Sequence, residues 1–157
     1  MVKIKIFVIG LYIKLATKLP NNLYCFFYNV YSLIFRLNTK FYYDRKRNLF
    51  FAKSPTQKRF FHEKLQNFNT YAKGITNRGI SLGETYFLDK IDFHDNDIII
   101  DCGANVGDLS IFFDEIGVSV EYIGIEPSPK ENECLKINCS NSQIYDYALW
   151  DSNQFKD

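Results

Sequence analysis

The sequence predicts an α/β protein in which about three parallel strands alternate with helices, preceded by a helical and basic N-terminal region. Ile98 to Ile100 are three β-branched residues in a row, the pattern of a parallel strand that is covered on both faces. Gly103 and Gly107 then permit a tight turn into a helix. The apolar runs at 118–125 and 143–148 supply the second and third strands.

The helix after the glycine turn is predicted from its apolar periodicity. Four apolar residues recur at helical spacing and are expected to face the sheet: Val106, Leu109, Phe113 and Ile116. Gly117 is placed to end this helix in the left-handed conformation.

A second helix is predicted after the second strand, over residues 129 to about 138. Ser128 is suited to the N-cap and Pro129 to the first helical position, and Glu131 completes a capping box. Leu135 is expected to point toward the sheet.

Two acidic residues beside the strand ends indicate which ligand the glycine turn accepts. A dinucleotide loop has the pattern G-x-G-x-x-G, whereas this chain has Asp101-x-Gly103-x-x-x-Gly107. A carboxylate in the turn repels a pyrophosphate but suits a ligand that carries an ammonium group. S-adenosylmethionine has both an ammonium group and a cationic sulfonium. Glu126, at the end of the second strand, is placed to accept both ribose hydroxyls.

The run Ile-Asp-Cys-Gly-Ala-Asn-Val-Gly at 100–107, followed by Ile-Glu-Pro-Ser-Pro at 125–129, resembles the FkbM family of S-adenosylmethionine-dependent methyltransferases. Tyr-Asp-Tyr-Ala-Leu-Trp-Asp at 145–151 is similar to the end of that family's third strand. The resemblance covers about residues 80 to 157. It implies a Rossmann-like class I methyltransferase fold, the cofactor S-adenosylmethionine, and methylation of a hydroxyl on a sugar, glycan or related acceptor.

The resemblance also implies the site residues. The cofactor-binding set is Asp101, Gly103, Ala104, Asn105, Gly107, Glu126 and Pro127. Tyr147 is a candidate neighbour of the adenine and Glu84 a weak candidate upstream of the first strand. No catalytic residue is assigned, and no metal site is expected.

The fold that the resemblance implies has about seven strands, and this chain stops after the third. We therefore expect an incomplete domain: a fragment, a truncated gene product, or a half that needs a partner or forms an oligomer. A non-catalytic module that binds the cofactor or a partner stays open as an alternative function, and so does a membrane-surface interaction protein.

Charge divides the chain into two predicted domains. Residues 1–80 hold 15 Lys and Arg against 2 Asp and Glu, and residues 81–157 hold 4 against 16. The asymmetry indicates that the first region meets an anionic surface or acceptor, such as a membrane or a phosphorylated glycan. Attraction between the two halves, or simple solvation of the charges, explains it equally well.

The N-terminal region is rich in apolar and aromatic residues. Within residues 1–20, the apolar run from Ile6 to Ile13 is too short to span a bilayer, and a peripheral helix is favoured over a signal peptide. A helix is predicted from Leu23 to Leu37, apolar on most of its surface, which packs into a core or subunit contact or lies on a membrane. Residues 50–52 suggest a short strand and 56–68 a helix.

The remaining predictions concern the connector and the cell compartment. Glycines make 69–82 a loop-rich connector, followed by a helix over 84–91. Basic residues interleaved with aromatics at 38–60 carry no nucleic-acid motif, so nucleic acid is not expected as a partner. The four cysteines form no C-x-x-C pair, which favours reduced thiols in a cytoplasmic protein, with peripheral membrane contact through 1–60.

Overall fold

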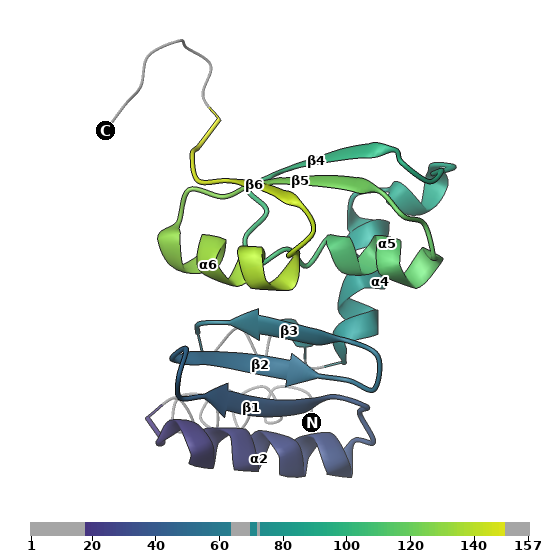
Figure 1. The fold of residues 1–157 in the computed structure, drawn as a ribbon. Coiled ribbons are helices and arrows are strands. Elements are labelled where there is room, and N and C mark those ends of the chain that lie inside the picture. Colours follow the sequence, from purple (N-terminus) through teal and green to yellow (C-terminus); the bar gives the residue numbers. More distant parts are fainter. Residues whose placement is uncertain (1–17, 64–69, 72, 150–157) are drawn as a thin grey trace, which may run out of the picture. The chain divides into compact units, whose positions relative to one another are not determined.

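The computed structural model describes residues 18–63, 70–71 and 73–149. The chain divides into two compact units, Met1–Ile75 and Thr76–Asp157, which are treated separately below. The sequence had placed this division at residue 80. Figure 1 shows the helices and strands of both units.

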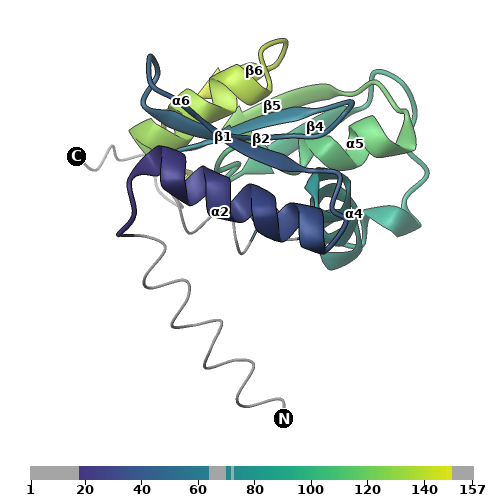
Figure 2. The same ribbon diagram turned by 90° about the horizontal axis from the view of Figure 1, so that it is seen from below.

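The first unit combines one helix with an antiparallel sheet. Helix α2 (Asn21–Ile34) is followed by strands β1 (Lys40–Asp44), β2 (Leu49–Lys53) and β3 (Lys58–Phe61), in the sheet order β1-β2-β3. Figure 2 shows α2 running along the strands of this sheet. The short strand predicted at 50–52 is confirmed within β2.

Strand β3 contradicts the predicted helix over 56–68, and the N-terminal region, expected to be mainly helical, contains a three-stranded sheet beside α2. The ring centroids of Phe51 and Phe60 lie 5.3 Å apart across neighbouring strands, and those of Tyr42 and Phe51 lie 5.1 Å apart. Such aromatic pairs stabilise antiparallel strands, and a local pattern does not reveal them. Residues 64–68 of that predicted helix lie outside the described residues.

The predicted helix over 23–37 is confirmed as far as Ile34, where α2 ends, and its tyrosine side provides the core contact. The Tyr28 ring centroid lies 4.2 Å from that of Phe41, and the Tyr24 ring packs against Phe50. The Asn29 side chain donates to the Phe41 carbonyl at 2.9 Å and accepts from the Phe41 amide at 2.7 Å. These contacts fix one face of α2 on the sheet.

The second unit contains the predicted parallel sheet. Strands β4 (Ile98–Cys102), β5 (Glu121–Ile125) and β6 (Gln143–Tyr145) lie in sequential order, with Asp101 opposite Gly124 in the register. Helix α5 (Ser110–Ile116) joins β4 to β5, and α6 (Pro129–Asn138) joins β5 to β6. The α/β class with three parallel strands is therefore confirmed, although β6 is shorter than the run predicted at 143–148.

The prediction that β4 is covered on both faces was wrong. Ile98 and Ile100 are 61% and 60% exposed, whereas Ile99 packs against the buried cluster around Leu135. Parallel strands in sequential order need right-handed crossovers, which place both connecting helices on the same face. Figure 1 shows α5 and α6 on one side of β4, β5 and β6. Among the described elements of this unit, no helix covers the other side.

Helix α4 (Ile75–Thr85) occupies most of the stretch predicted as a loop, and the helix predicted over 84–91 is reduced to a short 3₁₀ turn at Leu88–Lys90. The loop prediction was wrong because Gly79 and Gly83 allow close helix packing and do not form turns. A Cβ on Gly79 would lie 2.6 Å from Ile111, and one on Gly83 would lie 2.2 Å from the Phe112 ring. These two glycines, one turn apart, let α4 approach α5 closely.

The predictions for α5 hold in part. Gly117 adopts the left-handed conformation with φ of 72° and ends α5 as predicted. Val106 and Phe113 are buried, but Ile116 is 44% exposed, contrary to expectation.

Helix α6 begins and ends as predicted, with Pro129 first and Leu135 fully buried. Its capping box differs from the prediction: the Ser128 hydroxyl bonds the Glu131 carboxylate instead of a backbone amide.

Candidate functional site

The turn that follows β4 is fixed to the end of the neighbouring strand. The amides of Gly103 and Ala104 donate to the carbonyl of Ile125 at 2.9 and 3.0 Å. Gly103, Asn105 and Gly107 all have positive φ, at 83°, 50° and 84°. The turn therefore adopts a backbone conformation that favours glycine and asparagine, and the carboxyl ends of β4 and β5 meet beside it.

Glu126 fastens this turn to the start of α6. Its side chain is buried at 8% exposure, and one carboxylate oxygen accepts from the Asn105 amide at 2.9 Å. The other oxygen accepts from the Ser128 amide at 2.8 Å. Sequence reasoning assigned Glu126 a ligand role only and missed this structural one. A carboxylate offers about four acceptor positions, so two amides leave acceptor capacity for a ligand.

Asp101 lies at the end of β4 and is half-buried. The Tyr122 hydroxyl donates to its carboxylate. Burial raises the pKa of Asp101, and the nearby carboxylates of Glu126 and Asp108 raise it further, while the hydrogen bond from Tyr122 acts in the opposite direction. The ionised form of this carboxylate, at the carboxyl end of the sheet, therefore costs folding free energy.

The two glycines of the motif have different surroundings. A Cβ on Gly107 would lie 2.6 Å from the sulfur of Cys139 and 2.8 Å from Leu135, so this glycine allows the turn to pack on α6. A Cβ on Gly103 would meet no atom within 4 Å. The turn is thus tightly packed at Gly107, whereas free space lies beside Gly103.

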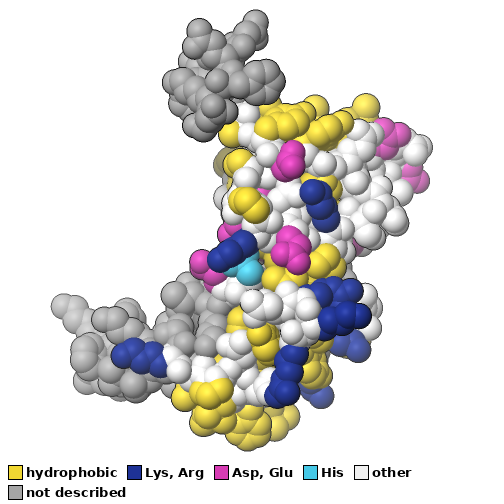
Figure 3. All heavy atoms as spheres, turned by 60° about the vertical axis from the view of Figure 1, so that its left-hand side comes forward, with side chains coloured by type: hydrophobic (Ala, Val, Ile, Leu, Met, Phe, Trp, Pro, Cys, Tyr) yellow, Lys and Arg dark blue, Asp and Glu magenta, His cyan; other side chains and the backbone are white. Residues whose placement is uncertain are grey.

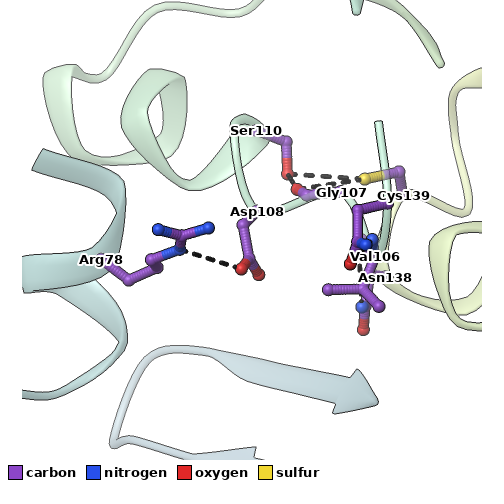
Figure 4. Close-up of polar contacts among 8 residues, drawn as sticks. Arg78, Val106, Gly107, Asp108, Ser110, Asn138 and Cys139 are labelled. Atoms are coloured by element: carbon purple, nitrogen blue, oxygen red, sulfur yellow. Dashed lines mark hydrogen bonds and ion pairs between the residues drawn. The ribbon is translucent and has the colours of Figure 1, made fainter. Parts of the chain in front are cut away.

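A third carboxylate that the sequence analysis did not single out borders the same turn. Asp108 is 7% exposed, and the Arg78 guanidinium on α4 bonds it at 3.1 Å. Figure 4 shows Arg78 pointing toward Asp108. Asp108 directly follows Gly107, but an arginine thirty positions upstream gives no local signal that would identify its partner.

Side chains from α6 complete the support of the turn. The Asn138 side chain donates to the Val106 carbonyl at 2.7 Å, and the Cys139 sulfur lies 3.4 Å from the Ser110 hydroxyl (Figure 4). Asn132, nearer the start of the helix, donates to the Glu126 carbonyl at 2.9 Å. Helix α6 thus holds both strand ends that the sequence identified.

The other predicted site residues vary in position. Ala104 is 5% exposed and belongs to the hydrophobic cluster with Leu135, which gives it a packing role. Pro127 is exposed directly after Glu126. Tyr147 is 49% exposed, with its ring 5.4 Å from that of Tyr145. Glu84 is exposed near the end of α4. Residues 150 and 151 of the family-like run lie outside the described residues.

The site is chemically acidic. Asp101, Asp108 and Glu126 surround one turn, and Arg78 pairs with one of them. Such a set accepts hydrogen bonds from hydroxyl and ammonium donors and disfavours phosphates. Within the described ranges, no cluster of His, Cys, Asp and Glu is suited to hold a metal ion.

No protein-family model and no curated protein matches the chain.

Proposed function

We propose that the chain binds S-adenosylmethionine at the carboxyl end of its parallel sheet, as part of a Rossmann-like methyltransferase that methylates a hydroxyl, such as that of a sugar. The observation that carries the proposal is the placement of Asp101 and Glu126. Asp101 is the next-to-last residue of β4 and Glu126 directly follows the adjacent parallel strand β5, so both lie beside the positive-φ turn at the edge where open α/β sheets bind ligands. The motif resemblance to the FkbM family supports the same ligand.

The acceptor capacity of the two carboxylates fits the two ends of this ligand. Asp101 receives one hydrogen bond, from Tyr122, and its remaining positions suit the ammonium of the methionyl group. Glu126 has about two acceptor positions beyond those that the amides of Asn105 and Ser128 occupy, and these suit the ribose hydroxyls. The open space beside Gly103 leaves room for the ligand to approach the backbone.

In the proposed reaction, S-adenosylmethionine supplies a methyl group on a sulfonium. The residues named here hold the donor and orient it for an in-line approach by the acceptor oxygen, an effect that can supply a large share of a rate enhancement. None of them is assigned to receive the proton of the acceptor hydroxyl.

The test compares two ligands in two isosteric variants by calorimetry. Asp101→Asn keeps an acceptor for Tyr122 but removes the charge, so affinity for S-adenosylmethionine should fall about tenfold to a hundredfold, the weight of one charged hydrogen bond. Methylthioadenosine lacks the ammonium, so its affinity should not change in that variant. Glu126→Gln should weaken both ligands.

Glu121→Gln is the matched control, because Glu121 is exposed at the opposite end of β5. Thermal unfolding of each variant separates lost binding from lost folding. Unchanged affinity of folded Asp101→Asn and Glu126→Gln for S-adenosylmethionine would refute the proposed site. Binding without release of S-adenosylhomocysteine in the presence of sugar acceptors would favour the non-catalytic binding module.

A further inference from the structure

Helix α2 of the first unit has an apolar face that its own sheet leaves uncovered. Its buried side chains are Tyr24, Cys25, Tyr28 and Ser32. Around the rest of the helix, large apolar side chains recur at helical spacing with exposures between 39% and 79%: Leu23, Phe26, Phe27, Val30, Leu33, Ile34 and, at the C-cap, Phe35. This set is here called the outer face of α2. Scattered exposed apolar residues are ordinary, but a continuous stripe of this kind marks an interaction surface.

The outer face contains no charged side chain, and a basic residue lies beyond each end of the helix. Helix α2 contains no charged residue over Asn21–Ile34, and exposed Lys18 and Arg36 lie beyond its two ends. Figure 3 shows hydrophobic side chains gathered over α2 at the lower end of the view, with Lys and Arg side chains bordering them. Apolar side chains bordered by basic ones match the layers of an anionic membrane surface.

The net charge of the first unit favours anionic lipid over a second copy of the chain as the partner of the outer face. Its described residues hold ten Lys and Arg against Asp44 and Glu63, and Asp44 is already paired with Arg47 at 3.0 Å. A second copy docked on the outer face would bring two strongly basic units together, which like-charge repulsion opposes. Anionic lipid headgroups neutralise the same charge.

We propose that the outer face of α2 docks the protein on an anionic membrane surface. The helix lies parallel to the surface, with Phe26, Leu33 and their neighbours among the acyl chains and the basic residues among the headgroups. At 14 residues, α2 is about 21 Å long at 1.5 Å per residue and does not cross a bilayer. None of the helices in the described part of the chain is long and apolar enough to span a membrane.

The test is flotation of the full chain with vesicles of phosphatidylcholine alone and of phosphatidylcholine mixed with phosphatidylglycerol. The wild type should float with the mixed vesicles. Phe26→Gln combined with Leu33→Gln should lower its partition by roughly tenfold or more, because two large apolar side chains no longer leave water. Both side chains are exposed, at 59% and 79%, so the fold should persist, as circular dichroism can verify.

The matched control is Ile98→Gln combined with Ile100→Gln, which removes two similarly exposed apolar side chains from the second unit and should leave flotation unchanged. Lys18→Gln with Arg36→Gln should weaken flotation only with the anionic vesicles. Three outcomes would overturn the proposal: no flotation of the wild type, equal flotation of the α2 variant, or equal flotation on neutral vesicles. Sedimentation showing that the α2 substitutions dissociate a dimer, without flotation of the wild type, would assign the face to a second copy.

Discussion

Both faces of the sheet β4-β5-β6 carry apolar strand residues, but the faces differ in their surroundings at β4. On one face, Ile99, Tyr122 and Ile144 pack with Leu135 of α6. On the other face, Ile98 and Ile100 are mostly exposed. The difference teaches that β-branched composition selects a strand, whereas the direction of the crossovers decides which of its faces is buried.

The largest expected contrast is between side chains on the two faces. Leu135→Ala should lower the free energy of unfolding by about 2–5 kcal/mol, because Leu135 is fully buried and its loss leaves a cavity. Ile100→Ala, at a 60% exposed position, should lower it by about 1 kcal/mol or less. Urea unfolding measures both. Equal losses would mean that another part of the chain covers the exposed face.

A smaller contrast separates the two glycines of the turn. Gly103→Ala and Gly107→Ala carry the same backbone strain, of about 1–2 kcal/mol, because φ is 83° and 84°. Only Gly107→Ala adds a collision with Leu135 and Cys139, so it should be destabilising by about a further 1–3 kcal/mol. The pair is its own control in thermal unfolding. A Gly103 variant as unstable as the Gly107 variant would show that the open side of the turn is packed.

The smallest expected effect depends on pH. Burial raises the pKa of Asp101, so the folded state binds its proton more tightly than the unfolded state. The stability that Asp101 contributes is therefore complete below its unfolded pKa of about 4 and is lost as the pH rises through the folded pKa. Asp101→Asn should accordingly be more stable than the wild type at neutral pH, and the difference should shrink toward about pH 4.

Thermal unfolding across this pH range, with exposed Glu121→Gln as the control, measures the effect. A less stable Asp101→Asn variant at neutral pH would show that the bond from Tyr122 to the carboxylate outweighs the penalty of burial. A more stable one would fit a residue retained for a ligand at a cost in stability.

The sequence by itself determined the elements whose signal is local. The β-branched run of β4, the left-handed Gly117, the α6 start at Pro129 and the turn around Gly103 all follow from the conformations that those residues favour. It also placed Asp101 and Glu126 at neighbouring strand ends, because parallel strands in βαβ order align their carboxyl ends.

Only the tertiary structure decided what depends on partners distant in the chain. Gly79 and Gly83 predict a loop from the sequence alone, whereas in the structure they let helix α4 pack closely on Ile111 and Phe112. Strand β3 is stabilised by aromatic pairs with β2. Likewise, the amides of Asn105 and Ser128 bind Glu126, whose carboxylate local spacing assigns to a ligand alone, and an arginine on α4 pairs with Asp108, to which local spacing assigns no role. The physical reason is that hydrogen bonds and close packing form between surfaces, and folding brings those surfaces together across tens of residues.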